Sequence, residues 1–351
     1  MNQKATAAVL GAGSLWGVIS IFVRNLNAMG LTAIQISLLR AMGGAAVMVL
    51  FLALTRRDLL KIKLRHIWYF VGTGIISLAL FNLCYFTVIE LSQASIAVVL
   101  LYTSPIFIMV ISAIVFKEKI TRNKLLALVM VFAGCVLVAG LLGGGYALTP
   151  TILLLGLGSG LFYGLYSIFG TVALRTYDTL TVTTYTFVFA TLGTLPFSDA
   201  GGMFRTMAAQ PVSILWGIGV SLICAVAPYL LYTWGLSRMP SSRAAILVTV
   251  GPLVGALIGI LLYQEPANPT KLLGMALIFG AVVVLNLTEA GAGDRFRRPI
   301  KSKRPDEVND FIGSFFSLKL KENRKKVRRN WRDVEVCSPR SLSYQVSLGT
   351  S

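Results

Sequence analysis

The chain contains two copies of one hydrophobic unit, separated by a constant offset of 147 residues. The same offset also aligns 13–22 with 160–169. A chain built twice from one apolar unit is typical of membrane transporters, in which two repeats enclose a substrate site. At this offset 95–126 aligns with 242–273 without gaps. The residues are identical at Ser95/Ser242, Ala97/Ala244, Pro105/Pro252, Glu118/Glu265, Lys124/Lys271, Leu125/Leu272 and Leu126/Leu273.

The composition is that of a membrane protein. Hydrophobic residues make up 56% of the 351 residues and charged residues only 13%, whereas a soluble domain has about 25% charged residues. Continuous apolar runs exclude barrel strands, which alternate and are about half as long. Ten runs, most of them near the roughly 20 residues that cross a bilayer as a helix, are expected to be transmembrane helices: 5–23, 31–54, 67–89, 94–116, 125–142, 151–172, 179–197, 212–236, 244–263 and 272–287.

Lysine and arginine are distributed unequally between the loops. If the N-terminus is inside, thirteen lie in cytoplasmic segments before the tail, whereas only Arg24, Arg205 and Lys271 lie in outside loops. Short loops rich in Lys and Arg resist translocation, so both termini are expected to be cytoplasmic. Five spans per repeat is an odd number, so the second copy enters with opposite polarity. We therefore expect an all-α polytopic membrane protein with ten transmembrane helices, arranged as inverted five-helix repeats at 5–142 and 151–287.

The last 64 residues, 288–351, lack apolar periodicity and carry 15 Lys and Arg against 8 Asp and Glu. Their composition predicts a basic, disordered cytoplasmic tail. In an alternative interpretation, apolar residues within 311–318 enter the headgroup layer while basic residues bind anionic lipid. The net charge of +18 is explained by the inside loops and this tail, so no nucleic-acid partner is expected.

Enzyme chemistry has little support in the sequence. His66 is the single histidine, which leaves no Ser–His–Asp or His-rich metal arrangement to build. The four cysteines, of which the tail holds Cys337, show no CxxC spacing. Gly143–Gly145 has neither the preceding strand nor the following Lys-Ser/Thr of a phosphate loop. No catalytic residue, metal site or cofactor is therefore expected.

Glycines and prolines inside the runs indicate packing and bending. Glycine recurs every fourth residue, at Gly13/Gly17 and Gly160/Gly164 among others, which places it on one helix face where backbones can approach closely. Pro105 and Pro252 interrupt the middle of equivalent runs and free a backbone carbonyl. Because both copies have this proline, a shared hinge or cavity role is expected, with a static kink as the alternative.

Arg40 is the exceptional polar residue of the apolar runs. It lies near the centre of 31–54, where an ionised side chain costs at least about 2.5–3.5 kcal/mol. No acidic residue lies at comparable depth, because Glu90, Glu118 and Glu265 fall at run ends. Two interpretations stay open: Arg40 bonds neighbouring carbonyls, or it contacts an anionic group of a substrate. The second copy has no corresponding cation, so a substrate site would be asymmetric.

Aromatic and hydroxyl side chains recur in both copies at equivalent depths. Together they can form a cavity for an amphipathic small molecule, although each alone is consistent with helix packing or an interfacial aromatic belt. With Arg40, the candidate cavity residues are Trp16, Ser20, Asn82, Tyr85, Tyr102, Tyr163, Ser167, Tyr232 and Trp234.

Glu118 and Glu265 occupy equivalent positions after the fourth span of each copy, beside Lys119 and Lys124 or Lys271. Solvated charge at a helix end is the simplest explanation. The alternative hypothesis is that the two glutamates form a paired gate.

The repeated unit resembles a known family. In 95–119 and again in 242–271, a serine begins an apolar run with a proline ten residues later, and a second apolar run ends at a Glu beside a basic segment. This pattern is similar to the signature of the EamA family of the drug/metabolite transporter (DMT) superfamily. The resemblance covers residues 5 to about 287. It implies a ten-helix inverted-repeat carrier, usually an exporter of amino acids or other small metabolites, with a cavity between helices one to four and six to nine. The family's usual Gly before the Glu is Lys117 and Gln264 here.

The expected function is secondary transport of a small polar or amphipathic metabolite, such as an amino acid, across the plasma membrane by alternating access. A multidrug or lipid-linked substrate exporter is the alternative within transport. A membrane-embedded enzyme or a receptor-like protein is the alternative of another class, and a deep His/Asp/Glu cluster would have favoured it. Energy coupling, direction and oligomeric state are not predicted by the sequence.

Overall fold

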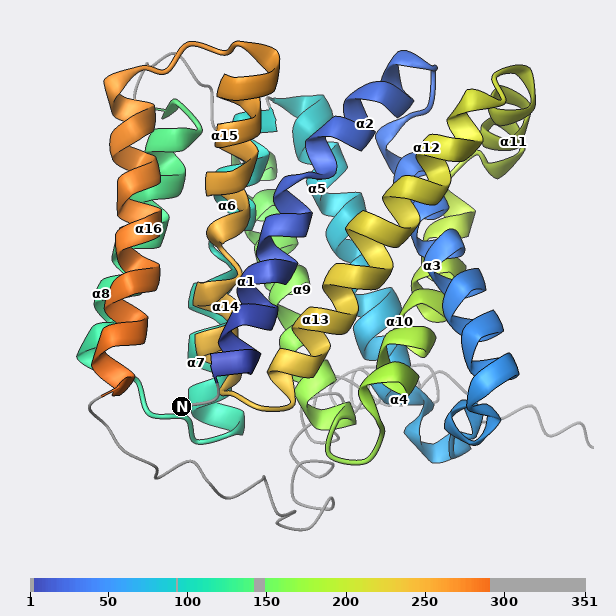
Figure 1. Cartoon of the computed structure of the whole chain (residues 1–351), viewed down its shortest axis with the longest axis horizontal. Coiled ribbons are helices and arrows are strands. Elements are labelled where there is room, and N and C mark those ends of the chain that lie inside the picture. The colour runs from blue at the N-terminus through green and yellow to red at the C-terminus, as the bar shows by residue number, and fades with distance from the viewer. Residues whose placement is uncertain (1–2, 93, 142–148, 291–351) are drawn as a thin grey trace, which may run out of the picture. The chain divides into compact units, whose positions relative to one another are not determined.

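The computed structural model describes residues 3–92, 94–141 and 149–290, and every regular element within them is a helix (Figure 1). The expected tail, 288–351, lies outside the described residues except for 288–290, which are the last residues of α16. In the first half the elements are α1 Gln3–Gly17, α2 Ile19–Ala28, α3 Ala33–Thr55, η1 Arg57–Leu60, η2 Leu64–His66, α4 Ile67–Phe70, η3 Val71–Ala79, α5 Leu80–Leu91, α6 Ala94–Leu101, α7 Ser104–Val115 and α8 Arg122–Val138. In the second half they are α9 Pro150–Ala173, α10 Thr179–Thr194, η5 Leu195–Phe197, α11 Ala200–Ala209, α12 Val212–Ser221, η6 Leu222–Val226, α13 Ala227–Leu236, α14 Ser241–Leu247, α15 Val250–Tyr263 and α16 Pro269–Ala290.

Eight helical segments of the described chain are long and apolar enough to cross a bilayer, so the prediction of an all-helical, polytopic membrane protein is confirmed. The other two expected spans correspond to α8 and α16. α8 has 17 residues and is about 26 Å long at 1.5 Å per residue, which is short of the ~30 Å hydrocarbon core. α16 has 22 residues and is about 33 Å long, which is enough to cross that core. The count of ten spans therefore stays a prediction.

Interruptions of the helices recur at the offset of 147 residues. α6 ends at Leu101 and α7 begins at Ser104, just before Pro105; α14 ends at Leu247 and α15 begins at Val250, just before Pro252. Proline causes such breaks because it lacks an N–H and its ring clashes with the carbonyl four residues back. The predicted interruption of both runs is confirmed, whereas a hinge role stays a prediction.

Close backbone contacts at two equivalent glycines hold these breaks in place. A Cβ on Gly13 of α1 would lie 2.5 Å from the Val248 carbonyl oxygen, and one on Gly160 of α9 would lie 2.9 Å from the Leu100 carbonyl oxygen. Neither distance leaves room for a side chain. Each half thus contributes its first long helix to pack on the broken helix of the other half, as the glycine spacing predicts.

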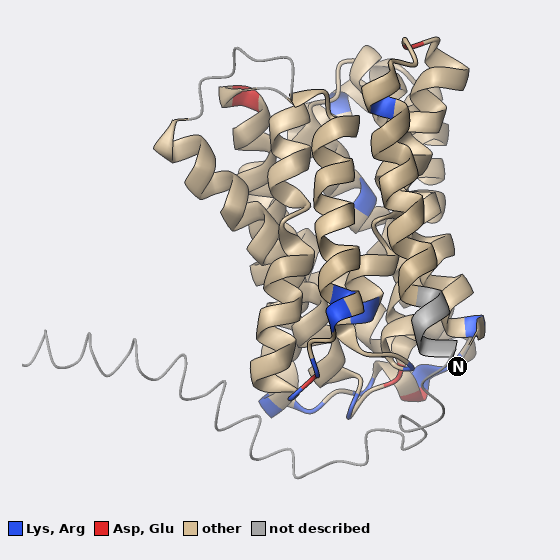
Figure 2. Ribbon diagram, turned by 90° about the vertical axis from the view of Figure 1, so that its left-hand side faces the viewer, with Lys and Arg blue, Asp and Glu red and all other residues tan. Residues whose placement is uncertain are grey.

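Charged residues gather at the two ends of the helix bundle (Figure 2). At one end, here called the Glu118 end, Phe116 lies under the Arg175 guanidinium, 5.2 Å from ring centroid to Cζ, and Glu118 bonds Ser241. At the other, the Glu265 end, Arg24 pairs with Glu265. The segments predicted to be cytoplasmic meet at the Glu118 end. Which end faces the cytoplasm stays a prediction.

Candidate functional site

A narrow cavity lies in the interior, between side chains of η3, α5, α9 and α13. Its volume is about 10 Å³, which is close to the minimum for one water molecule. A metabolite can therefore enter only if helices separate. The lining residues are Ser77, Leu78, Phe81, Tyr163, Tyr166, Ser167, Tyr229 and Tyr232.

Two π-helical segments border this cavity at equivalent positions of the two halves. η3 contains the lining residues Ser77 and Leu78, and η6 ends three residues before Tyr229. A π-turn widens the helix and misaligns its backbone hydrogen bonds, and it occurs often at functional sites. The Ser77 hydroxyl is buried and has no hydrogen-bond partner among the residues that the structure describes. Because Ser77 lines the cavity, a ligand there can satisfy this hydroxyl.

Arg40 lies on α3 beside the second π-segment. The Ser221 hydroxyl, directly before η6, donates to the carbonyl oxygen of Leu39 at 3.3 Å. The electrostatic neighbours of Arg40 are Tyr163, Tyr229 and Cys224. Within the part of the chain that the structure describes, the Arg40 guanidinium makes no hydrogen bond or ion pair. The backbone-bonded interpretation of Arg40 therefore has no support in this conformation.

Four of the other predicted residues come together at the cavity. Tyr163, Ser167 and Tyr232 line it, and the Ser167 and Tyr232 hydroxyl oxygens are 2.8 Å apart. Trp16 of α1 packs on Tyr232 and Tyr229, with ring centroids 5.6 Å and 5.1 Å apart. These aromatic contacts join the first half to the second.

The remaining predicted residues lie outside the lining. Tyr85 packs on Phe81, a lining residue, at 5.7 Å between centroids. Asn82 is buried, Ser20 has a buried hydroxyl without a partner, and Tyr102 packs on the main hydrophobic core. Trp234 lies under the Arg238 guanidinium, 3.9 Å from ring centroid to Cζ, and so faces the Glu118 end.

Ser77, Leu78, Phe81, Tyr166 and Tyr229 line the cavity but were not among the predicted residues. Tyr229 had a sequence signal, because it is the equivalent of Asn82 at the common offset. Tyr166 lies three residues after Tyr163 and so shares its helix face. For Ser77, Leu78 and Phe81 the apolar run offers no comparable signal.

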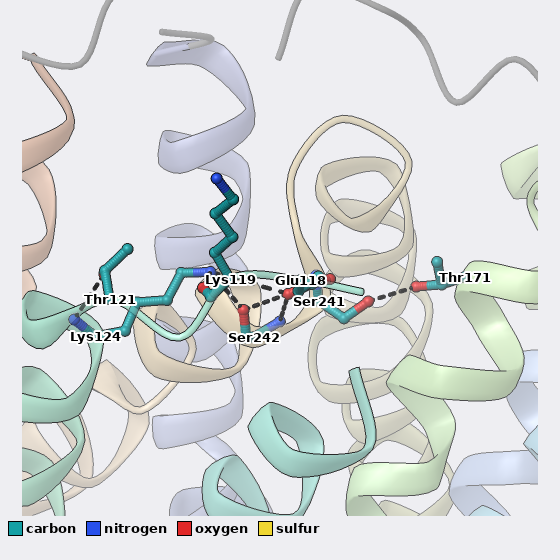
Figure 3. A network of polar contacts seen from close by, with 7 residues as sticks. All are labelled: Glu118, Lys119, Thr121, Lys124, Thr171, Ser241 and Ser242. Atoms are coloured by element: carbon teal, nitrogen blue, oxygen red, sulfur yellow. Dashed lines mark hydrogen bonds and ion pairs between the residues drawn. The ribbon is translucent and has the colours of Figure 1, made fainter. Parts of the chain in front are cut away.

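A polar network at the Glu118 end ties the two halves together (Figure 3). The Glu118 carboxylate accepts the backbone N–H of Ser241 at 2.8 Å, the N–H of Ser242 at 3.2 Å and the Ser242 hydroxyl. The Lys124 ammonium donates to Ser242 Oγ at 2.8 Å and lies 4.0 Å from Glu118. Ser241 Oγ and Thr171 Oγ1 are 2.8 Å apart. Glu118 thus caps the start of α14, which belongs to the other half.

Glu265 has different partners at the opposite end. It forms ion pairs with Arg24 and Lys271, each at 2.9 Å, and Arg24 also lies over the Tyr263 ring. The hydrogen bond from Lys271, supported by the charges of Lys271 and Arg24, lowers the pKa of Glu265 against a smaller opposing effect of burial. No hydrogen bond joins Glu265 to the start of α6 within the described residues.

The same turn positions both glutamates. Lys117 and Gln264, the residues before them, have left-handed backbones, with φ of 54° and 52°. The N–H of Glu118 then bonds the Ser112 carbonyl at 3.2 Å, and the N–H of Glu265 bonds the Gly259 carbonyl at 3.0 Å, so each turn closes on the residue six positions back. Lys117 and Gln264 therefore adopt a left-handed backbone conformation that is normally favoured by glycine.

Comparison with known proteins supports a transport role. The model of the EamA-like transporter family matches residues 3–140 and again residues 150–287. A protein of Archaeoglobus fulgidus named "Uncharacterized transporter" is 27% identical over 287 residues, 79% of this chain and 94% of that one. "Uncharacterized transporter YwfM" of Bacillus subtilis is 22% identical over 279 residues, 79% of this chain and 92% of that one. A solved crystal structure has a TM-score of 0.68 at 18% identity and covers 84% of this chain and 100% of the other, which shows the fold alone.

Proposed function

Because the chain belongs to the EamA-like transporter family, we propose that it is a secondary transporter that exports a small amphipathic metabolite, such as an amino acid or a related compound, by alternating access. The chain is a multi-pass membrane protein. The proposed location is the plasma membrane, with both termini in the cytoplasm. The proposed partners are the small-molecule substrate and the lipid bilayer.

The observation that carries this proposal is the lack of a partner for Arg40. An ionised arginine at this depth costs at least about 2.5–3.5 kcal/mol, and no described acidic side chain offsets that cost. The Arg40 charge acts electrostatically on Tyr163 and Tyr229, which line the cavity. A guanidinium presents parallel donors that match a carboxylate. We infer that the substrate carries an anionic group, which binds Arg40.

The rest of the lining fits an amphipathic molecule. Tyr166 and Tyr229 line the cavity with aromatic rings, and Trp16 packs on Tyr229. Such rings bind apolar or flat groups and cationic amines. Ser77 offers a hydroxyl without a partner. A compound with a carboxylate, a short polar group and a compact body uses all of these features.

Alternating access is proposed because the cavity is too narrow for such a compound. The substrate would enter when the helices separate at one end, and it would leave when they separate at the other. The broken helices α6–α7 and α14–α15 and the π-segments η3 and η6 are the elements best suited to that change, because interrupted helices bend at their breaks.

A multidrug exporter is the second candidate, favoured by the aromatic lining of the cavity. Such a transporter would bind its substrates mainly through apolar contacts, so the charge of Arg40 would matter little.

Metabolite profiling of medium and cytosol from overexpressing and deletion cells identifies the substrate. Counterflow in proteoliposomes then tests Arg40. Arg40→Lys keeps the positive charge but loses the two parallel donors of the guanidinium, so it should weaken substrate binding about 10–100-fold. Arg40→Gln also removes the charge and should nearly abolish transport. Arg205→Gln, a change at an exposed arginine of α11, is the control and should transport normally. Normal kinetics of Arg40→Gln would remove Arg40 from the site and favour the second candidate.

Orientation is tested by single cysteines in a cysteine-free background. Asn268→Cys lies at the Glu265 end and Lys63→Cys at the Glu118 end, and both positions are exposed. An impermeant thiol reagent applied to intact cells should label Asn268→Cys and not Lys63→Cys. Labelling of both positions from outside contradicts the proposed topology.

A further inference from the structure

We propose that Glu118 and Glu265 are two alternating latches, each of which closes one end of the transporter by binding the start of the other half's broken helix. The inference rests on the proposed alternating access. In this structure Glu118 is latched and Glu265 is released. In the opposite state Glu265 would bind Ala94 and Ser95 at the start of α6, and Glu118 would be free.

The closed latch is complete at the Glu118 end. Both Glu118 oxygens accept bonds from Ser241 and Ser242, and the side chains of Glu118 and Lys124 are only 10% and 7% exposed. A carboxylate so placed satisfies backbone N–H groups at the start of α14 that have no partner within the helix. Opening this end would expose those N–H groups and the carboxylate to water together.

The groups of the closed latch have equivalents at the offset of 147 residues. Ser242 corresponds to Ser95, Glu118 to Glu265 and Lys124 to Lys271, and each of these pairs is identical in residue type. The second set therefore contains the same acceptor, hydroxyl and ammonium. What differs is the partner, because Glu265 pairs with Arg24 and Lys271 and not with α6.

Arg24 explains why the second latch is released. Its equivalent at the other end is Thr171, an uncharged residue that bonds Ser241. Lys124 remains beside Glu118 in the closed latch, so Lys271 can stay beside Glu265 when that latch closes. Arg24 then has to give up its ion pair. We infer that Arg24 holds Glu265 away from α6.

The Glu118 end is more buried and more closely packed than the Glu265 end. All seven residues of α14 are buried, whereas only Ile96, Ala97 and Val99 of the eight residues of α6 are. α14 packs closely against α7, whereas the equivalent pair, α6 and α15, is packed much less closely. Glu265 is 37% exposed, against 10% for Glu118. The end with the closed latch is therefore the closed end of the molecule.

Matched cysteine reporters test the latches without a substrate. Ala245→Cys reports on α14 at the Glu118 end, and its equivalent Val98→Cys reports on α6 at the Glu265 end. Glu118→Gln places an amide N–H against the backbone donors. It should raise the labelling rate of Ala245→Cys at least about fivefold and lower that of Val98→Cys, because a lost charged hydrogen bond is worth about a factor of ten.

Glu265→Gln is the matched control and should shift both labelling rates in the opposite direction. Faster labelling of both reporters in Glu118→Gln would mean that Glu118 only stabilises the fold, and it would overturn the proposal. Unchanged labelling of both would overturn it as well. Because labelling needs no transport, reciprocal shifts together with normal transport by Arg40→Gln would reject the anionic substrate and keep the latches.

Disulfide trapping tests the state that the structure does not contain. Glu118→Cys with Ser242→Cys should cross-link readily in this state. Ser95→Cys with Glu265→Cys should cross-link as well. In the Val98→Cys reporter, which keeps Glu265, Arg24→Thr should lower the labelling rate at least about threefold, because it removes one exposed ion pair that holds Glu265 away from α6. If the second pair fails to cross-link under conditions in which the first pair does, the exchange of latches is wrong.

Discussion

The two ends of this protein have nearly the same residues and different interactions. At the Glu118 end a glutamate, a serine and a lysine form one buried network with the start of α14. At the Glu265 end the equivalent glutamate forms partly exposed ion pairs with the equivalent lysine and with Arg24. Equivalent residues have different partners at the two ends. This is expected if the structure is one of two states in which the two halves exchange their conformations.

The comparison also shows where stability is concentrated. The network of the Glu118 end is shielded from water, so its hydrogen bonds act in a medium of low dielectric constant. The ion pairs of the Glu265 end are open to solvent and screened. Equivalent substitutions at the two ends should therefore have unequal effects, and the first two of the four predictions below use that inequality.

The largest difference is expected between Lys124→Met and Lys271→Met. Lys124→Met removes a buried ammonium that bonds Ser242 and neutralises Glu118, which should lower the free energy of unfolding by about 3 kcal/mol. Lys271→Met leaves Glu265 its pair with Arg24 and should cost less than about 1 kcal/mol. Denaturant titration of the purified protein in detergent micelles measures both. Equal losses would show that the two ends are equally closed.

Ser242→Ala and Ser95→Ala form the second comparison. Ser242 donates to Glu118 and accepts from Lys124, and hydrogen bonds to charged groups contribute about 1.5–3 kcal/mol. A loss of about 2 kcal/mol is therefore expected for Ser242→Ala. Ser95→Ala should change stability by no more than about 0.5 kcal/mol. A large effect at Ser95 would mean that the Glu265 latch is already closed in solution.

The turns before the glutamates should behave alike at both ends. Lys117 and Gln264 hold left-handed backbones, which cost a residue with a Cβ about 1 kcal/mol relative to glycine. Lys117→Gly and Gln264→Gly should each raise the free energy of unfolding by roughly 0.5–1 kcal/mol. This pair is the control for the first two comparisons. A gain at one end alone would mean that the two turns are not equivalent.

Acid should weaken the Glu265 end by a small amount. The pKa of Glu265 is lowered by its hydrogen bond with Lys271 and by the nearby cations. Its stabilising contribution is therefore present above the ordinary carboxyl pKa of about 4.3 and is lost as pH falls through the lowered value. The difference in thermal stability between the unmodified protein and Glu265→Gln should disappear across that range. A difference that persists at low pH would contradict the assigned ion pairs.

Much of the fold follows from the sequence because its signals are repeated. Apolar runs predict the helices, and the equivalent prolines predict the breaks before Pro105 and Pro252. The glycine spacing predicts the close contacts of Gly13 and Gly160. The run 125–142 matches α8, which has 17 residues and is short for a span, because the run extends past the helix end at Val138.

The site could be predicted only in part. Tyr163, Ser167 and Tyr232 were found because aromatic and hydroxyl groups recur at the common offset, and Arg40 because no acid lies at its depth. Ser77 was missed because one serine in an apolar run gives no sign of the π-turn that directs it to the cavity. The difference between Glu118 and Glu265 could not be predicted, because a repeated sequence describes both states equally and the structure adopts one.

The measurement that tests this account most directly is the distance across each end, obtained by pulsed electron spin resonance in nanodiscs. Spin labels on Lys119→Cys and Ser237→Cys report on the Glu118 end, and the equivalent exposed positions Pro266→Cys and Glu90→Cys report on the Glu265 end. Glu118→Gln should lengthen the first distance and shorten the second. If both distances lengthen together, or neither changes, the two ends are not coupled and the alternating latches are wrong.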